Sequence, residues 1–268
     1  MWPGRWPWGW NRTRTGIAIL LLLAWGAVKL PWEEQMGLRR RQIMYGDTPP
    51  ISFELRDSLG QGLTLAALGG FRGLAANFVW ISLTGAWEEQ QWTRVRTLAE
   101  FAVLLQPRVL FFWENGAWHL AWNASVAAEK YAAAGQSDGQ RNRESRRWIE
   151  AGRVMLERGL LAIPEKPQLY MRLGELYQQR LQDYEAAARC YRLAAERPGA
   201  PSFAERFVGY MLEKAGRKQE AYDYWLTLWH SSAEHPPGTP RQWPKIEQQM
   251  RALERELNIP ADKRVFNP

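Results

Sequence analysis

Residues 164–198 read PEKPQLYMRLGELYQQRLQDYEAAARCYRLAAERP, and this stretch gives the strongest indication of the fold. Large and small apolar residues recur within it at helical spacing, which predicts two helices joined by a turn. Small residues lie where the helices would cross, and prolines 34 residues apart bound the stretch. A helical pair of this size cannot bury its own apolar face, so it must stack against further pairs. The stretch therefore predicts an all-α chain built from repeated helical pairs.

The order of residues in this stretch resembles the tetratricopeptide repeat. That repeat has Trp or Tyr, Leu-Gly and Tyr, followed by Ala, Phe or Tyr, a second Ala and a final Pro. The matching residues here are Tyr170, Leu173, Gly174, Tyr177, Ala187, Tyr191 and Ala194. One extra residue lies in the turn at 178–183. The resemblance implies a right-handed α-solenoid of helix-turn-helix repeats.

A second copy of the pattern follows the first. Its residues have the family's spacing and its turn glycine, and they are Val208, Gly209, Leu212, Gly216, Ala221, Trp225 and Leu228. Prolines at 236, 237 and 240 should then interrupt the array. Beyond them, Ile246, Met250, Leu253 and Leu257 have helical spacing. We expect a last helix there, at about 244–257, that caps the apolar end of the array.

Two looser copies precede the first, and each second helix would end at a proline, Pro107 or Pro164. The helix residues are Trp92, Val95, Ala99 and Ala102 before Pro107, and Ile149, Gly152, Leu156 and Gly159 before Pro164. The two prolines lie 57 residues apart, which is 34 plus 23, so this repeat must contain an insertion. The polar stretch 135–145 supplies it, either as a disordered loop or as a docking element.

These patterns divide the chain into four parts. We predict an N-terminal arm and membrane anchor at 1–32, and a linker and pre-repeat helix at 33–73. About four helical pairs occupy 74–232, with an insertion at 133–147, and a capping helix and tail occupy 233–268. An ordinary all-α bundle is the alternative, because helical periodicity alone is common. The 34-residue spacing argues against that alternative.

The charge and the tryptophans are distributed unevenly. The net charge is +7, of which residues 1–50 carry +4 (seven Lys and Arg against three Asp and Glu), and the remaining residues carry only +3. The sequence contains neither a basic stripe nor a recognised nucleic-acid-binding motif, which argues against DNA or RNA as a partner. Eight of the 16 tryptophans precede residue 88. Tryptophan is enriched at bilayer interfaces, so the N-terminal part is expected at a membrane.

An uncharged segment at 16–28 lies between arginines and Lys29. The anchor residues are Gly16, Ile17, Leu20, Leu21, Leu22, Leu23, Trp25 and Trp32. Spanning a bilayer takes about 20 helical residues. The span would therefore run from Thr15 to Trp32, with Lys29 reaching toward the headgroups. We predict a single-pass anchor, and the alternatives are a cleaved signal peptide or a buried or interfacial helix.

A second resemblance bears on location. The segment that follows the linker, through Trp80, is similar to one in a group of bacterial membrane-anchored tetratricopeptide proteins. This resemblance implies an envelope setting without implying an activity. We therefore expect the protein in a bacterial inner membrane, with the repeats outside the cytoplasm.

Members of the tetratricopeptide family bind ligand peptides on a concave face that the first helices form. Transferring those positions by register gives the expected partner-binding residues, which are Trp80, Trp87, Phe111, Glu114, Trp118, Trp122, Met171, Glu175, Gln178 and Tyr210. Rigid aromatic side chains are typical of binding hot spots. Alternatively, the segment 63–76 of the same chain covers the tryptophans. The family's lysine and asparagine clamp for a carboxylate is absent from these positions.

The sequence suggests no catalytic chemistry. It has no nucleophile elbow, P-loop or dinucleotide-binding glycine pattern. The histidines at 119, 230 and 235 lack partners at metal-ligand spacing, and Cys190 is interpreted as a buried thiol. We predict no enzyme activity, no cofactor and no metal. The expected function is a membrane-anchored scaffold or adaptor for a membrane-proximal protein. The alternatives are a glycan- or lipid-binding module of envelope polymer assembly or export, or an enzyme.

Overall fold

The computed structural model describes residues 71–130, 136–234 and 241–266, and within these ranges it contains helices and turns but no β-strand. The all-α prediction is therefore confirmed for the described part of the chain. The helices are α3 (Arg72–Glu88), α4 (Trp92–Leu105), α5 (Leu110–Trp118), α6 (Ser125–Lys130), α7 (Asp138–Ala162), α8 (Pro167–Leu176), α9 (Tyr184–Ala195), α10 (Phe203–Lys214), α11 (Lys218–His230) and α12 (Trp243–Glu256).

Three short segments complete the helical structure. The π-helical segment η1 (His119–Ala124) joins α5 to α6, so that these three elements form one continuous helix. A second π-helical segment, η2 (Tyr177–Leu181), extends α8. A single 3₁₀ turn, η3 (Ala261–Lys263), follows α12. The extra residue that the sequence places at 178–183 is accommodated by η2, because a π turn takes in one more residue than an α turn.

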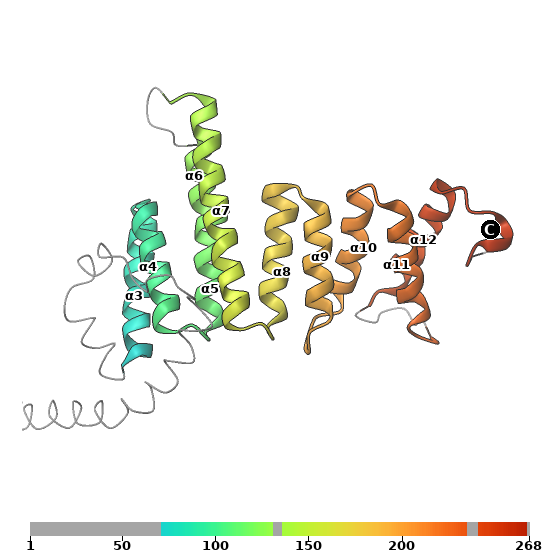
Figure 1. Ribbon diagram of the computed structural model, residues 1–268, viewed down its shortest axis with the longest axis horizontal. Coiled ribbons are helices and arrows are strands. Elements are labelled where there is room, and N and C mark those ends of the chain that lie inside the picture. Colours follow the sequence, from blue (N-terminus) through green and yellow to red (C-terminus); the bar gives the residue numbers. More distant parts are fainter. Residues whose placement is uncertain (1–70, 131–135, 235–240, 267–268) are drawn as a thin grey trace, which may run out of the picture.

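The helices stand side by side in chain order (Figure 1). Each helix packs mainly on the helices next to it in the sequence, and α5 also contacts α8 across the intervening α7. The row therefore consists of α3 with α4, the α5–η1–α6 helix with α7, α8 with α9, and α10 with α11, followed by α12. Pairs that contact only their neighbours are typical of repeat architectures.

Local sequence signals begin several of these helices. Ser137 and Gln140 form a capping box at the start of α7, and the side chain of Asp183 accepts a hydrogen bond of 2.9 Å from the backbone N–H of Ala186 at the start of α9. Pro167 lies in the first turn of α8, where its missing N–H costs nothing. Gly216 has φ +77° in the turn between α10 and α11, a conformation that favours glycine.

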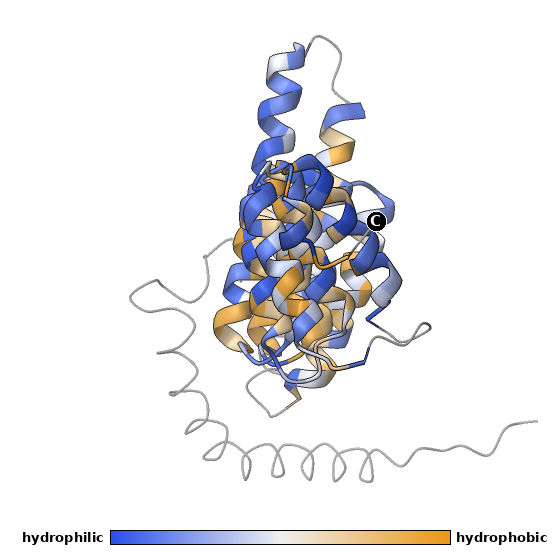
Figure 2. Ribbon diagram, turned by 90° about the vertical axis from the view of Figure 1, so that its right-hand side faces the viewer, coloured by the Kyte–Doolittle hydropathy of each residue, from blue (hydrophilic) through white to orange (hydrophobic). Residues whose placement is uncertain are grey.

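The insertion is partly helical. Residues 138–147 form the first turns of α7, and the start of α7 projects with α6 beyond the rest of the row (Figure 1). Figure 2, which looks along the row, shows that hydrophilic residues cover most of this projecting part of α7. The stretch is therefore a helical extension rather than a simple loop over the residues that the structure describes.

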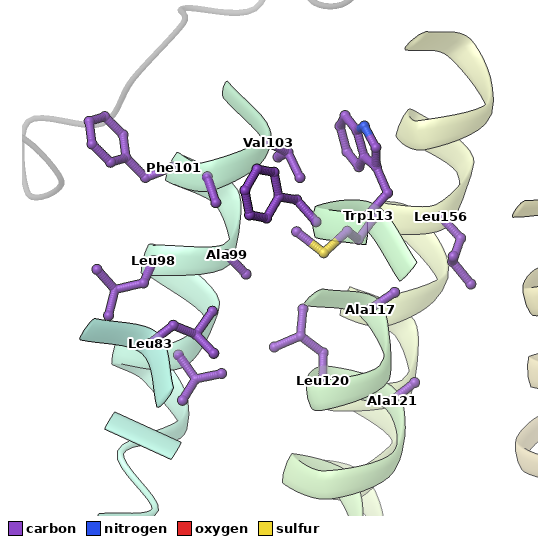
Figure 3. Close-up of a cluster of buried hydrophobic side chains, with 14 of the residues drawn as sticks. Leu83, Leu98, Ala99, Phe101, Val103, Trp113, Ala117, Leu120, Ala121 and Leu156 are labelled. Carbon is purple, nitrogen blue, oxygen red and sulfur yellow. The ribbon is translucent and has the colours of Figure 1, made fainter. Parts of the chain in front are cut away.

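Two large clusters of buried side chains form the core. The first joins α3, α4, α5, η1, α7 and α8 and includes Cys190 of α9, and Figure 3 shows Leu83, Leu98 and Leu120 among its members. The second joins α9, α10, α11 and α12. Trp113 and Trp225 are fully buried, one in each cluster. Burying large aromatic rings contributes much of the stability of cores of this kind.

The two buried tryptophans keep their ring N–H groups satisfied. Nε1 of Trp113 donates to the carbonyl oxygen of Pro107 at 2.8 Å, and Nε1 of Trp225 donates to Oε1 of Glu213 at 2.8 Å. A Cβ atom at Gly209 would lie 2.2 Å from the Trp225 ring. The close packing of α10 on α11 therefore requires glycine at this position.

The anchor prediction, with all of its residues from Gly16 to Trp32, lies outside the described residues, as does most of the linker at 33–73. Among the helices that the structure describes, none combines the length and the hydropathy needed to cross a bilayer.

Candidate partner-binding surface

The structure brings aromatic side chains of α3, α5 and η1 together on one surface. We call Trp80, Trp87, Phe111, Trp118 and His119 the aromatic surface. Its ring centroids lie 5.0 Å apart for Trp80 and Phe111, 5.6 Å for Trp87 and His119, and 5.2 Å for Trp118 and His119. The exposed fractions are 38% for Trp87, 48% for Phe111 and 44% for Trp118, so three large rings face solvent together.

His119 lies at the centre of this surface. Its ring centroid is 6.1 Å from that of Trp80, in addition to the contacts with Trp87 and Trp118. Nδ2 of Asn123 lies 3.1 Å from Nδ1 of His119. Burial lowers the pKa of His119 below 6.5, because the charged imidazolium would lose hydration there. The ring is therefore uncharged at pH 7, and the centre of the surface carries no cation from it.

Trp122 lies one turn beyond Trp118 and connects the aromatic surface to η2. Its Nε1 donates to Oε1 of Gln179 at 3.1 Å, and Nε2 of Gln179 donates to Oε1 of Glu175 at 3.2 Å. Arg180 of η2 also contacts the start of α6, because its Nη2 lies 2.9 Å from Oγ of Ser125. These bonds fix the first helices of two successive pairs against each other.

A charged group borders the aromatic surface. Arg172 lies 3.4 Å from Glu114 and 2.8 Å from Glu175, so it bridges α5 and α8. Burial raises the pKa of Glu114, and the charge and hydrogen bond of Arg172 act in the opposite direction. The edge of the surface therefore holds a partly buried carboxyl group beside an arginine, which can orient a polar group of a ligand.

The other expected binding residues lie farther along the row. Oε1 of Gln178 accepts a hydrogen bond of 3.1 Å from the hydroxyl group of Tyr191. Tyr210 makes ring contacts with Phe207 and Trp225, and burial raises its pKa. Met171 packs against buried residues of the C-terminal half. These three side chains are partly buried and extend the first-helix surface beyond the aromatic part.

Sequence reasoning missed the roles of His119 and Arg172. His119 was considered only as a metal ligand, whereas its ring packs between tryptophans. The sequence contains part of the information needed to predict these contacts. His119 follows Trp118 directly, and Arg172 precedes Glu175 by three residues on a helix, a spacing at which side chains meet. The π segments gave no sequence signal beyond the extra residue at 178–183.

The groups that could bind a metal ion or act as a nucleophile can be assessed for the described residues. Across 71–130, 136–234 and 241–266, no three His, Cys, Asp or Glu side chains are grouped so as to hold a metal ion. Cys190 is buried, and burial raises the pKa of its thiol to about 12. The thiol is therefore protonated at neutral pH, and a protonated thiol is a poor nucleophile.

No protein-family model matches the chain, and no curated protein matches it. The relation to the tetratricopeptide family therefore stays a prediction, which rests on the residues of the repeats themselves.

Proposed function

We propose that the protein is a membrane-anchored, non-catalytic adaptor that binds a protein partner through the aromatic surface. The observation that carries this proposal is that the exposed rings of Trp87 and Trp118 pack against an uncharged histidine, while the exposed ring of Phe111 packs on Trp80 beside them. Rigid aromatic side chains offer a large contact area at a small entropic cost, and they dominate the binding energy of many interfaces. A helical or extended segment with apolar side chains fits such a surface.

We further propose that the helical row is a right-handed α-solenoid of the tetratricopeptide type. Packing at the helix crossings supports this proposal. A Cβ atom at Gly174 would lie 3.1 Å from the Tyr191 ring, so the first and second helices of this pair meet at a glycine. The equivalent glycine of the next pair is Gly209, against Trp225. In this architecture the aromatic surface lies on first helices, which form the concave face in the family that the chain resembles.

The membrane anchor at 1–32 is part of the same proposal. A tether holds the aromatic surface close to the membrane, which raises its effective concentration toward a membrane-proximal partner. Binding at the surface can then be weak in solution and still persist at the membrane. The Glu114 and Arg172 side chains at its edge supply a polar contact that sets the orientation of the partner.

The test is affinity recovery of the full-length protein from its native membrane after crosslinking. We expect the double variant Trp87→Ala, Trp118→Ala to lose a defined set of recovered proteins. The matched control is Leu161→Ala, Leu193→Ala, which removes two exposed apolar side chains elsewhere. Circular dichroism of all three chains checks that the helices are retained. An unchanged set of proteins in the tryptophan variant would overturn the proposal.

A second candidate is binding of a glycan or a lipid head group in envelope polymer assembly or export. The exposed rings of Trp87 and Trp118 favour it, since flat aromatic faces can stack on sugars. Tryptophan fluorescence of the protein, titrated with defined oligosaccharides and lipids, separates the two candidates. A response that the Trp87→Ala, Trp118→Ala variant loses would favour the second candidate.

A further inference from the structure

A groove runs between α4 and α7, apart from the aromatic surface. Its volume is about 580 Å³, and its lining includes Arg96, Arg147, Val154, Met155 and Arg158. A second hollow, of about 460 Å³, shares Arg96 and Arg147 with the first and adjoins the projecting start of α7. Leu120 contributes to the floor of the groove. Residues two positions apart point to roughly opposite sides of a helix, so this groove lies away from Trp118 and Trp122.

Five arginines and two glutamates line this groove, so arginine is in excess. Among the residues that the structure describes, Arg143, Arg146 and Arg147 form no ion pair. Both glutamates of the lining are already paired: Glu100 lies 3.0 Å from Arg96, and Glu150 accepts a hydrogen bond of 2.7 Å from Arg153, which is not a lining residue. Glu144 lines the second hollow. Arginines at i and i+4 repel each other, so a ligand with negative charge would relieve this repulsion.

The groove floor between the arginines is apolar. Arg147, Ala151, Val154 and Arg158 follow one another at i, i+4, i+7 and i+11, so they form one stripe along α7. At 1.5 Å per residue, the two arginines of the stripe lie about 16 Å apart along the helix. Val154 is exposed between them. The stripe thus offers positive charge at both ends and apolar contact in the middle.

We propose that this groove binds an acidic, amphipathic peptide segment of a partner protein. Carboxylates at the two ends of the segment would pair with Arg147 and Arg158, while apolar side chains between them would rest on Val154 and Met155. A lipid head group concentrates its charge at one point and would leave one end of the stripe unpaired. A nucleic acid carries phosphates along its whole length, and the apolar middle of the groove offers them no donor.

This site goes beyond the proposed function, because it uses second helices and a different ligand chemistry. The two surfaces can then be occupied at the same time, one by an apolar segment and one by an acidic segment. The two proposals can be tested separately, because the variants of the aromatic surface and those of the groove share no residue. A negative result for one proposal therefore does not contradict the other.

The test selects a displayed library of random dodecapeptides on the full-length chain in a non-ionic detergent. We expect the enriched peptides to carry Asp or Glu on both sides of apolar residues. Fluorescence anisotropy with a synthetic copy of the most enriched peptide should show about tenfold weaker binding to the variant Arg143→Gln, Arg147→Gln, Arg158→Gln. Binding should also weaken as the salt concentration rises, because the charges lie at the surface.

The matched control is Arg189→Gln, Arg255→Gln, which removes two exposed arginines from other helices and should bind like the unaltered chain. Because Arg158 also lies over the Trp113 ring at 5.9 Å, the double variant Arg143→Gln, Arg147→Gln tests the groove while leaving that contact intact. Enriched peptides without acidic residues, or equal binding to all variants, would overturn the proposal. So would arginine-dependent binding to phosphatidylglycerol vesicles or to a single-stranded oligonucleotide without enrichment of acidic peptides.

Discussion

The two ends of the helical row differ in how their apolar surfaces are covered. At the C-terminal end, the chain folds back over α12, and Phe266 packs on Trp229 with ring centroids 5.0 Å apart. At the other end, α3 exposes Leu74 (55%), Phe78 (54%) and Ile81 (66%). These three side chains are spaced i, i+4 and i+7, so they form one apolar stripe. A repeat row needs a polar or covered surface at each end, and within the described residues only the α12 end has one.

The α12 end is closed by a buried carboxylate as well as by apolar contacts. Oε1 of Glu254 accepts hydrogen bonds from the hydroxyl group of Tyr222 at 3.1 Å and from the backbone N–H of Val265 at 2.8 Å. Glu254 therefore ties α11, α12 and the segment after α12 together. By contrast, α3 has no charged residue between Arg72 and Glu88. The two terminal helices therefore differ in chemistry, although each packs mainly on one neighbour.

The largest expected effect is at the closed end. Trp243→Ala should lower the free energy of unfolding by about 3–5 kcal/mol, because it removes a large buried ring from the contact of α12 with α11. Denaturant unfolding of the full-length chain, followed by circular dichroism, measures the loss. Trp87→Ala, which truncates an exposed ring near the other end, is the control and should cost much less. Equal losses of unfolding free energy for Trp243→Ala and Trp87→Ala would contradict the proposed difference between the two ends.

The second prediction concerns Glu254. Glu254→Ala should cost roughly 1–3 kcal/mol, because it leaves the Tyr222 hydroxyl group and the Val265 N–H without their acceptor in a buried place. Glu254→Gln keeps an acceptor oxygen and should cost less. Glu256→Ala removes a half-exposed carboxylate that pairs with Lys218 at the surface, and it serves as the control. A loss for Glu254→Ala no greater than for the control would contradict the role of Glu254 in closure.

The third prediction is a pH dependence near the same end. Burial raises the pKa of Glu213, the hydrogen bond from Trp225 lowers it, and the charge of Glu256 on α12 raises it. A carboxyl group whose pKa is higher in the folded state stabilises the fold while it is protonated. That contribution is complete below the unfolded pKa and is lost as the pH rises through the folded pKa.

We therefore expect the stability of the chain to gain less from a rise in pH above 4.5 than it would without Glu213. The variant Glu213→Gln keeps an acceptor for Trp225 and cannot ionise. The loss of stability that ionisation of Glu213 causes as the pH rises should therefore be absent from this variant. Unfolding curves at several pH values between 4 and 7 compare the two chains. Parallel pH profiles would show that Glu213 does not contribute.

The smallest expected effect is at the α3 end. Ile81→Ser should change the free energy of unfolding by less than about 0.5 kcal/mol, because the side chain is exposed in the described part of the structure. Val79→Ser, which lies two residues away and is buried, is the matched control and should cost several times more. A large loss for Ile81→Ser in the full-length chain would show that the stripe is covered, and it would remove the contrast between the two ends.

Spacing in the sequence predicted much of the helical row. The pattern around Tyr170 and Tyr191 predicted a pair of helices, and the structure has α8 and α9 there. Small residues marked the crossings, because two helices approach closely only where side chains are small, as at Gly209 against Trp225. Spacing could not predict the π segments η1 and η2, since they depend on how successive pairs fit together.

The candidate surface was predicted in part. Register transfer placed Trp80, Trp87, Phe111 and Trp118 on first helices, and the structure packs the three tryptophan rings against His119 and the Phe111 ring against Trp80. It could not reveal that His119 is the centre, because that position depends on contacts between α3 and η1. Nor could it reveal the Arg172 bridge between Glu114 and Glu175, which joins helices of different pairs.

Helical periodicity, the small residues at the crossings and the unequal distribution of charge and tryptophan can all be read from the sequence alone. These properties are local, because they depend on residues within one or two helices. Which side chains meet across pairs depends on tertiary packing, as for the tryptophan rings around His119 and the arginines of the groove between α4 and α7. The physical reason is that packing between pairs sets the relative position of surfaces, and no spacing within one helix encodes that position.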